Sequence, residues 1–411
     1  MFEVIDNHTS AGVIKVLGVG GAGNNSIRHM LNTPVQNVEY IAVNTDVQAL
    51  RMVAGAQQLD IGARLTRGLG AGAKPQVGYE AALEDKQRLI EAIGDADMVF
   101  ITAGMGGGTG TGAAPVIAEL AKAKGILTVG VVTTPFPHEG RKRQKVADCG
   151  LKAMADVCDS LVVVPNGNLI SALGKNATLT KAFAEADKVL SQAVEGISSL
   201  IVNHGFINVD FADVCTVMRD SGSAVMGIGE ASGEGRVQKA LDAALRSPLL
   251  GNADITNATG VLLNIAGEEG LTIDEFNQAG EIVYGVTCED AEIVTGLSID
   301  NELNDRVRVT VIATGVAFDD QHVSHENDLV KGHEPSSKNG QNAVAHDAGA
   351  KSKNTLDEFS QTAASVSRSE TLSVMRGEKP RQDALADRHP KRRNSPNPED
   401  MVDIKSLWRS K

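Results

Sequence analysis

The sequence predicts an α/β fold in which parallel strands alternate with helices that cover both faces of a sheet. Short apolar runs rich in β-branched residues are typical of strands buried on both faces, and stretches of helical period separate them. Glycine clusters follow two of these runs, where a strand has to turn into a helix. The core has to be mainly aliphatic, because 42% of the residues are hydrophobic and only 3% are aromatic.

The elements of the first half can be placed in order along the chain. The expected parallel strands are Val13–Val19, Val38–Val43, Met98–Ala103, Ile126–Thr133 and Leu161–Val164. Helical stretches at Tyr79–Ile93 and Thr111–Lys124 lie between strands, and this alternation predicts a Rossmann-like parallel sheet. A long helix is expected from about Thr178 to Asn203, where Asn203-His204-Gly205 forms a stop signal.

Residues 205–318 predict a second α/β domain with a mixed sheet. Its expected strands are Ala224–Ile228, Gly260–Ala266, Glu292–Ile299 and Arg306–Thr314. Its expected helices are Val214–Met218, Gly235–Leu245 and Thr272–Tyr284. We expect the last two strands to pair antiparallel as a hairpin.

The ends of the chain carry little apolar surface. Residues 1–12 predict a flexible N-terminus, and residues 319–400, with Phe359 as their single aromatic residue, predict a disordered linker. Residues 401–411 regain apolar character, because Ile404, Leu407 and Trp408 fall on one face of a helical turn. The predicted domains are therefore 13–177, a central helix at 178–204, and 205–318, before the linker and a terminal peptide.

The charge and the cysteines exclude several classes of protein. A net charge of −13 argues against nonspecific nucleic-acid binding, which needs a basic surface. The four cysteines form no CxxC pair and no histidine stands at a metal-ligand spacing, so we expect free thiols and no protein metal site. The first twelve residues do not form a signal peptide, and no apolar run is long enough to span a bilayer. A soluble, cytoplasmic protein without direct membrane insertion is expected.

The first glycine cluster is Gly18-Val19-Gly20-Gly21-Ala22-Gly23-Asn24-Asn25, directly after the first strand. Glycine lets the backbone approach a phosphate closely, and the N-terminus of the next helix supplies aimed N–H donors and partial positive charge. Asn24 and Asn25 suit a helix start. Gly18, Gly20 and Gly23 also satisfy GxGxxG with Asp46 further on, so a nicotinamide-dependent dehydrogenase remains an alternative, and so does a purely structural turn.

The second cluster is Gly104-Met105-Gly106-Gly107-Gly108-Thr109-Gly110-Thr111-Gly112, between a predicted strand and a helix. An ordinary β–α connection needs one or two glycines, so six in nine positions favour a second phosphate cradle over a flexible turn. Thr109 and Thr111 would add hydroxyl donors. No Gly-Lys-Ser/Thr follows either cluster, which excludes a Walker-type loop. Two such loops on neighbouring strand ends favour a nucleoside triphosphate.

Residues 106–112, Gly-Gly-Gly-Thr-Gly-Thr-Gly, resemble the signature of the tubulin/FtsZ superfamily. The resemblance extends over residues 13–317. Asn44-Thr45-Asp46, Gly68-Leu69-Gly70-Ala71-Gly72 and residues 208–213 are similar to the FtsZ branch rather than the tubulin branch. It implies a polymerising GTPase that binds GTP or GDP with Mg²⁺ and forms the ring of a bacterial division site. A GTP-binding relative that does not hydrolyse is the third alternative.

The resemblance implies further nucleotide contacts, residue by residue. The cofactor-binding set comprises Gly20, Gly21, Ala22, Gly23, Asn24, Asn25, Asn44, Asp46, Ala71, Gly72, Gly106, Gly107, Gly108, Thr109, Gly110, Thr111, Glu139, Arg143 and Asp187. Glu139 matches an acid that contacts the ribose, and Arg143 matches a basic residue near the nucleotide. Asp187 matches the residue that reads guanine, since a carboxylate can accept from both the N1–H and the exocyclic amine.

The resemblance also assigns catalytic roles to Asn208, Asp210 and Asp213. They follow the long helix, whose 26 or so residues span close to 40 Å, so they cannot reach the nucleotide at its other end. In the family, the matching loop enters the site of the next subunit and positions water or a cation there. This implies head-to-tail filaments and hydrolysis that depends on assembly. Within a single subunit, helix capping by Asp210 is the alternative interpretation.

The last residues stand where the family has a peptide that docks on division proteins and membrane tethers. Lys405 replaces a usual proline, and Leu407-Trp408 departs from the usual order of an aromatic residue and leucine. Ile404, Leu407 and Trp408 still fit docking of a helix into a groove. A frayed chain end without a function is the alternative.

Overall fold

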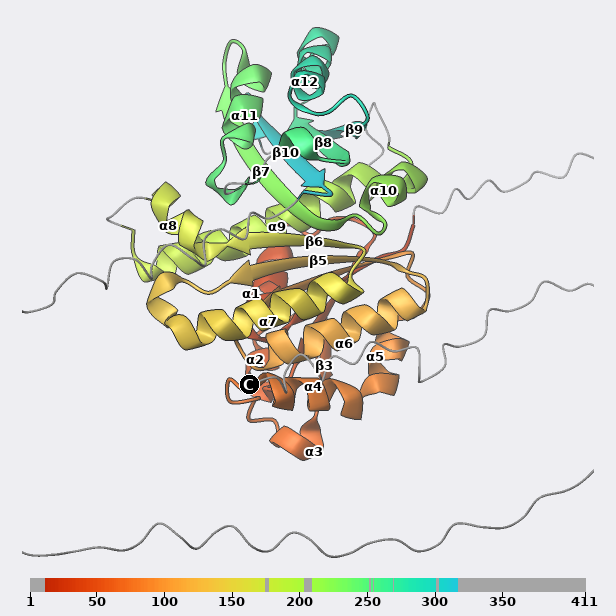
Figure 1. Cartoon of the computed structure of the whole chain (residues 1–411), viewed down its shortest axis with the longest axis vertical. Helices are drawn as coiled ribbons and strands as arrows, with labels where there is room; N and C mark the ends of the chain where they lie inside the picture. The colour runs from red at the N-terminus through yellow and green to blue at the C-terminus, as the bar shows by residue number, and fades with distance from the viewer. Residues whose placement is uncertain are drawn as a thin grey trace, which may run out of the picture. The chain divides into compact units, whose positions relative to one another are not determined.

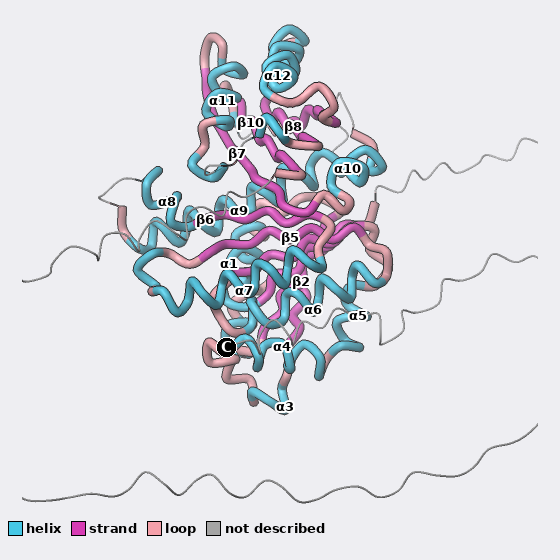
Figure 2. The backbone as a smooth tube through the Cα atoms, viewed as in Figure 1, coloured by secondary structure: helices cyan, strands magenta, loops and turns pink. Residues whose placement is uncertain are grey.

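The computed structural model describes residues 12–173, 177–202, 209–250, 253, 255–268, 270–300 and 303–316. Its centre is a sheet of ten strands in the order β3-β2-β1-β4-β5-β6-β7-β10-β8-β9. The strands are magenta in Figure 2. The strands are β1 Ile14–Val19, β2 Val38–Asn44, β3 Gln57–Asp60, β4 Met98–Gly104, β5 Leu127–Thr134, β6 Ser160–Pro165, β7 Gly222–Ser232, β8 Gly260–Gly267, β9 Glu292–Ile299 and β10 Arg306–Thr314. The α/β fold is therefore confirmed.

The helices connect these strands as crossovers. They are α1 Gly20–Met30, α2 Val47–Arg51, α3 Ala63–Thr66, α4 Pro75–Glu84, α5 Lys86–Ile93, α6 Thr109–Ala123, α7 Arg141–Val157, α8 Asn166–Leu173, α9 Leu179–Val202, α10 Phe211–Met218, α11 Arg236–Leu245 and α12 Ile273–Val286. Short 3₁₀ turns lie at Pro137–Glu139, Pro248–Leu250 and Ile255–Asn257. Within the described residues, no helix combines the length and apolarity that crossing a bilayer requires.

The sheet differs from the sequence prediction in its last strands. β1 through β7 are parallel, whereas β10 lies between β7 and β8 and is antiparallel to both. The expected hairpin of β9 and β10 is wrong, because β9 pairs with β8 in parallel, starting at Gly260↔Glu292. β3 escaped prediction because Leu59 is the single apolar residue of its four.

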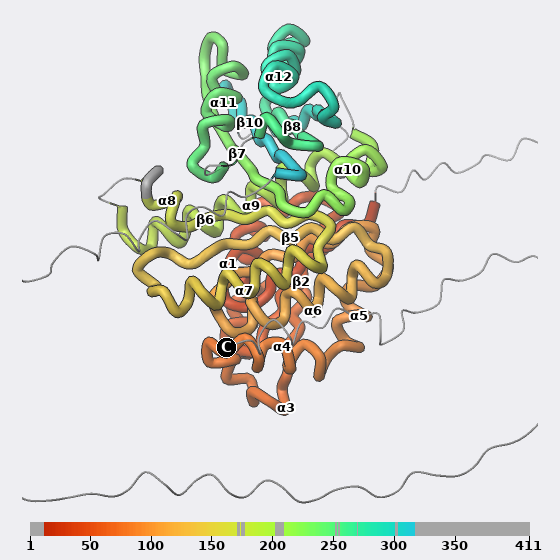
Figure 3. Tube along the Cα trace, viewed as in Figure 1, coloured from red at the N-terminus to blue at the C-terminus, as the bar shows by residue number. Residues whose placement is uncertain are grey.

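Two helical layers cover the parallel part of the sheet (Figures 1 and 3). On one face, α1 and α9 share an apolar core with β1, β4 and β5 that includes Ile27, Phe100 and Val194. On the other face, α4 to α7 share a second core that includes Ile101 and Ile117. The expected helix Tyr79–Ile93 is two helices, because the chain bends at Asp85 (φ −104°, ψ 24°), whose carboxylate accepts from Gly62 N at 2.7 Å.

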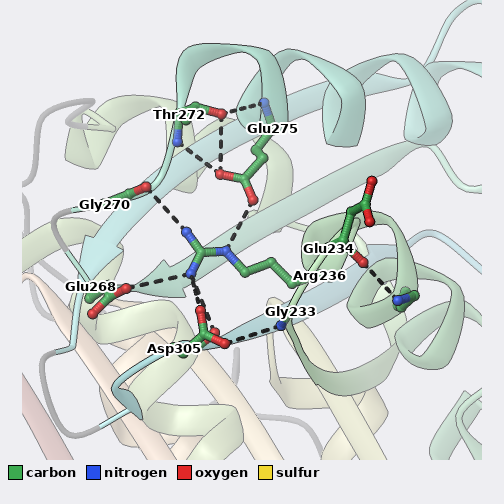
Figure 4. Close-up of polar contacts among 9 residues, drawn as sticks. Gly233, Glu234, Arg236, Glu268, Gly270, Thr272, Glu275 and Asp305 are labelled. Carbon is green, nitrogen blue, oxygen red and sulfur yellow. Dashed lines mark hydrogen bonds and ion pairs between the residues drawn. The ribbon is translucent and has the colours of Figure 1, made fainter.

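Arg236 of α11 forms hydrogen bonds and ion pairs that connect several elements of the second α/β region (Figure 4). Arg236 is 8% exposed, and its guanidinium lies among three carboxylates, with Nε donating to Glu275 Oε1 at 3.0 Å and Nη1 to Asp305 Oδ1 at 3.2 Å. Glu268 lies 3.5 Å from Nη1, and Nη2 donates to the carbonyl of Gly270 at 3.2 Å. One buried cation thus joins α11, the start of α12 and the segment before β10.

The four cysteines are free thiols, as the sequence predicts. Four parts of the sequence prediction lie outside the described residues: the N-terminus, the linker with the terminal peptide, the stop signal Asn203-His204-Gly205, and Asn208. The end of α9 at Val202 lies one residue before the predicted end of the long helix.

Candidate functional site

The two glycine clusters lie against each other at one edge of the sheet. β1 and β4 are neighbouring parallel strands, so their carboxyl ends meet at the edge that we call the carboxyl edge. A Cβ built on Gly20 would lie 2.8 Å from the Gly110 nitrogen, and one on Gly104 would lie 2.7 Å from Ala22 Cβ. The loops are therefore packed so closely that a side chain at Gly20 or Gly104 would collide with the other loop.

Both loops open directly into helices that lack a capping side chain. α1 begins at Gly20 and α6 at Thr109, and neither has an acidic residue in its first turn. The first N–H groups of a helix have no intrahelical partner, and here no side chain replaces one. The expected start of α1 at Asn24 and Asn25 is wrong by one turn, because Gly20 (φ 74°) lets the helix begin immediately after β1.

The glycines divide into packed and open positions. A Cβ on Gly23 would lie 2.3 Å from the Thr102 carbonyl oxygen, and one on Gly108 would lie 2.8 Å from Ala71 Cβ. By contrast, a Cβ on Gly21, Gly72 or Gly107 would meet nothing within 4 Å. Unfilled space beside two uncapped helix N-termini fits an anionic group such as a polyphosphate.

Buried amides and hydroxyls join the two loops to the end of β2. With its amide turned so that both atoms are satisfied, Asn24 donates to the Gly18 carbonyl at 2.8 Å and accepts from Asn44 Nδ2 at 3.0 Å. Asn44 Oδ1 in turn accepts from Thr45 N at 2.9 Å. The Thr45 and Thr109 hydroxyls are 2.6 Å apart. Asn25, one position further along α1, is exposed.

Two of the predicted contacts have structural partners of their own. Asp46 is the N-cap of α2, and its Oδ1 accepts from Gln48 N and Ala49 N. Thr111 is fully buried and accepts from Gly106 N at 2.9 Å, so it shapes the second loop from inside. Thr109, at the start of α6, is 8% exposed, and its hydroxyl contacts that of Thr45.

The 3₁₀ turn after β5 holds the predicted ribose acid. Glu139 Oε1 accepts from Phe136 N at 2.8 Å, and its Oε2 pairs with Arg143 Nη1 at 2.8 Å. Phe136 makes an edge-to-face contact with Phe183 of α9, with ring centroids 5.0 Å apart. The turn and the first part of α9 are therefore neighbours at the carboxyl edge, and Phe183 is a half-exposed flat side chain that sequence reasoning did not assign to the site.

Asp187 lies one helical turn beyond Phe183. Burial raises the pKa of its carboxyl to about 6, and the positive charge of Arg28 on α1 opposes this shift. A partly buried carboxyl with a raised pKa is a common mark of a functional position.

Asn166 is a candidate site residue that the sequence analysis does not assign. It follows β6 at the same edge, is 6% exposed, and has a side-chain oxygen without a partner. The next residue, Gly167, faces Pro137 of the 3₁₀ turn, since a Cβ there would lie 3.7 Å from Pro137 Cγ. A buried acceptor without a partner is costly, which fits a ligand that supplies the donor. An asparagine directly after an apolar strand was the available signal.

The predicted catalytic acids lie at the opposite edge. Phe211 of α10 lies beside Gly12, two residues before β1, and Gly12 also faces Asp97, which directly precedes β4, so α10 begins at the amino ends of these strands. Asp210 is the N-cap residue of α10, yet its side chain makes no capping hydrogen bond, and Asp213 is exposed in the first turn. The capping interpretation of Asp210 is therefore wrong. Asn208 lies outside the described residues.

Two packed glycine loops, two uncapped helices and a long helix between two α/β regions define a GTPase of the tubulin-like class. The family described as Tubulin/FtsZ family, GTPase domain, matches residues 13–174, and FtsZ family, C-terminal domain, matches residues 222–317. Residues 13–317 thus carry both halves of the expected resemblance.

Relatives and solved structures agree with this assignment. The chain is 52% identical over 316 residues to Cell division protein FtsZ of Pseudomonas aeruginosa and 51% identical to that of Azotobacter vinelandii, in each case covering 77% of this chain and 80% of the relative. An empty FtsZ dimer structure from M. jannaschii superposes with a TM-score of 0.72 at 46% identity, over 74% of this chain and 88% of that one. The chain belongs to the FtsZ family of GTPases.

A more distant structure shows the same fold. CetZ2 from Haloferax volcanii, solved as a GTPγS-bound protofilament, has a TM-score of 0.62 at 22% identity, over 76% of this chain and 95% of that one. The family membership makes the protein a GTPase and replaces the dehydrogenase alternative, whose acidic residue Asp46 caps a helix here.

Proposed function

We propose that this protein hydrolyses GTP at a site shared by two successive subunits of a head-to-tail filament. The observation that carries the proposal is the separation of the two halves of the site. The glycine loops lie at the carboxyl edge of the sheet, and Asp210 and Asp213 lie at the amino edge. α9 has 24 residues and spans about 36 Å, so the acids of one chain do not reach its own nucleotide.

The carboxyl edge binds the nucleotide. The N–H groups of Gly20, Gly21, Ala22 and Gly23 hold phosphates on one side, and the loop Gly106–Gly110 holds them on the other. Ala71 and Gly72 close the phosphate end, while Asn25 and Arg143 lie on its outer side. The Glu139 carboxylate shares its hydrogen bonds with the ribose. Asp187 and Asn166 read the guanine edge. The Asp187 carboxylate accepts hydrogen bonds from the base, and the buried side-chain oxygen of Asn166 is a further acceptor.

The amino edge of the next subunit supplies the hydrolytic groups. Asp210 and Asp213, with Asn208, position water in line with the terminal phosphate, and the water oxygen bonds to phosphorus as the bond to GDP breaks. The described residues contain no cluster of His, Cys, Asp or Glu that could hold a metal ion by itself. Mg²⁺ bound mainly through the phosphates would neutralise their charge, as is usual for this ion.

Charge and apolar exposure at the two edges suit an association of unlike surfaces. Arg141, Lys142, Arg143 and Lys145 are exposed at the start of α7, on the carboxyl edge of a chain that carries −13 overall. Leu69, beside the loop residues Ala71 and Gly72, is 79% exposed. The amino edge carries the exposed acids Asp97, Asp210 and Asp213, whereas Asp95 and Asp220 pair there with Lys124 and Lys122. Opposite charges on the two ends favour head-to-tail contact, which produces open filaments.

The names of the relatives connect this chemistry to cell division. Those proteins are called cell division proteins, so we infer that the filaments of this chain build a cytoplasmic ring at midcell and that hydrolysis sets their turnover. Ile404, Leu407 and Trp408, outside the described residues, would recruit division proteins and membrane tethers. The boundaries 13–177, 178–204, 205–318 and 319–400 belong to the same proposal.

Sedimentation and phosphate release, measured together across protein concentration, test the proposal. With GTP, we expect pelleted protein and hydrolysis to rise from the same critical concentration, and GDP should support neither. Filaments that persist without phosphate release would instead favour the third alternative, a protein that binds GTP but does not hydrolyse it. Full hydrolysis in a dilute monomeric sample would overturn the shared site.

A further inference from the structure

Thr45 stands where three nucleotide loops meet, although neither glycine cluster contains it. Its side chain is 1% exposed, and its hydroxyl lies 2.6 Å from that of Thr109 at the start of α6. Its carbonyl accepts from Gly70 N at 3.0 Å and from Thr66 Oγ1 at 3.3 Å, in the loop that leads to Ala71 and Gly72. Its N–H donates to Asn44 Oδ1 at 2.9 Å. The backbone of Thr45 is thus held from two sides, which fixes the place of its hydroxyl.

Two hydroxyls at this distance have one proton between their oxygens, and either hydroxyl can be the donor of that hydrogen bond. The described residues offer the Thr45 hydroxyl no hydrogen-bond partner besides Thr109. The Thr109 hydroxyl can make a second hydrogen bond, because Thr109 begins an uncapped helix beside Gly107. A Cβ built on Gly107 would meet nothing within 4 Å, so the space there is open. If Thr45 donates, both protons have an acceptor once an anion occupies that space.

We propose that Thr45 is a positioning residue for the nucleotide, which donates to Thr109 and thereby directs the Thr109 proton toward the phosphates. The inference rests on the proposed GTP site and adds a residue to it. A donor to Thr109 also polarises its hydroxyl, and hydrogen bonds in such a chain strengthen one another. Thr45 acts only through Thr109, since it is buried behind it.

Affinities for GDP and GTPγS, measured by calorimetry on the full chain below its assembly concentration, test this role. Thr45→Val should weaken binding about fivefold, the value of one net hydrogen bond. Thr45→Ala, which removes the hydroxyl and puts no methyl group in its place, should weaken binding by a similar factor. Thr45→Ser keeps the hydroxyl, so its affinity should stay within about twofold of that of the unmodified protein. Thr128→Val is the matched control, because Thr128 is a buried threonine near the amino end of β5 whose hydroxyl, among the residues that the structure describes, bonds only to the Ile126 carbonyl.

A double-mutant cycle separates positioning from a general structural loss. If Thr45 acts through Thr109, Thr45→Val should cost nothing further in a Thr109→Val background, whereas independent effects would multiply. Multiplying losses, unchanged affinity of Thr45→Val, or equal losses in Thr45→Ser and Thr45→Val would each overturn the inference. Failure of the unmodified protein to bind either guanine nucleotide would instead overturn the proposed site.

Discussion

The base-reading role of Asp187 predicts that nucleotide affinity depends on pH in a specific way. An ionised carboxylate accepts two hydrogen bonds from guanine, whereas a protonated carboxyl loses acceptor capacity. Burial raises the pKa of Asp187 from 3.8 to about 6, so the residue changes charge in a range where most carboxylates are already ionised. Lowering the pH toward 5.5 is therefore the perturbation, and Asp187→Asn is its matched control.

The magnitude follows from the raised pKa. With a pKa of about 6, the carboxyl is about 99% ionised at pH 8, about half ionised at pH 6 and about a quarter ionised at pH 5.5. If only the ionised form reads guanine, affinity should fall about fourfold between pH 8 and pH 5.5. The pH dependence of stability is opposite to that of affinity. Because the raised pKa means that the folded state holds the proton more tightly, Asp187 lowers the free energy of unfolding as the pH rises from about 4 to about 6.

Calorimetric titration with GDP between pH 5.5 and pH 8 measures this effect. Phosphate groups of the nucleotide titrate in the same range, and Asp187→Asn retains that contribution while it removes the carboxyl. The ratio of the two affinities should therefore change about fourfold across the range. A ratio that stays constant, or a steeper fall in Asp187→Asn, would show that Asp187 does not read the base through its ionised form.

Further predictions concern packing, a buried cation and the charged edge. Gly23→Ala should lower the free energy of unfolding by about 2 kcal/mol, because its Cβ would collide with a carbonyl oxygen, while Gly21→Ala should change it by less than about 0.5 kcal/mol; urea unfolding compares them. Arg236→Met should cost about 2 kcal/mol in the same assay, because it removes the charge-assisted hydrogen bonds of a buried guanidinium to carboxylates that are themselves partly solvated, and a neutral result would contradict this. Lys142→Glu with Lys145→Glu should raise the critical concentration for assembly and flatten its salt dependence; an unchanged concentration in light scattering would remove α7 from the interface.

Sequence patterns predicted the strands well because burial on both faces imposes continuous apolar runs. β10 begins and ends where the sequence predicts, and so does β9, although β9 is a mostly half-buried edge strand. The pairing of these strands was not predictable in the same way, because apolar alternation does not say which neighbour a strand takes. β10 enters between β7 and β8 through long-range pairing, whereas closeness along the chain favours a hairpin of β9 and β10.

In the site, too, features set by nearby residues could be predicted from the sequence, whereas features set by tertiary contacts could not. Glycine content identified both loops, because close backbone contact requires it. The start of α1 at Gly20, the partners of Thr111 and the free acceptor of Asn166 depend on neighbours distant in sequence. The raised pKa of Asp187 depends on burial of α9, which a helical pattern alone does not quantify.

Complementation between two defective chains tests the shared site most directly. Asp213→Ala keeps the nucleotide pocket and loses an acid, while Gly107→Leu places a side chain in the open phosphate space and keeps the acids. Each chain alone should release phosphate slowly, and an equimolar mixture should release it several times faster than the sum, because an intact pocket then meets intact acids. A mixture no faster than the sum of its parts would contradict a site built from two subunits.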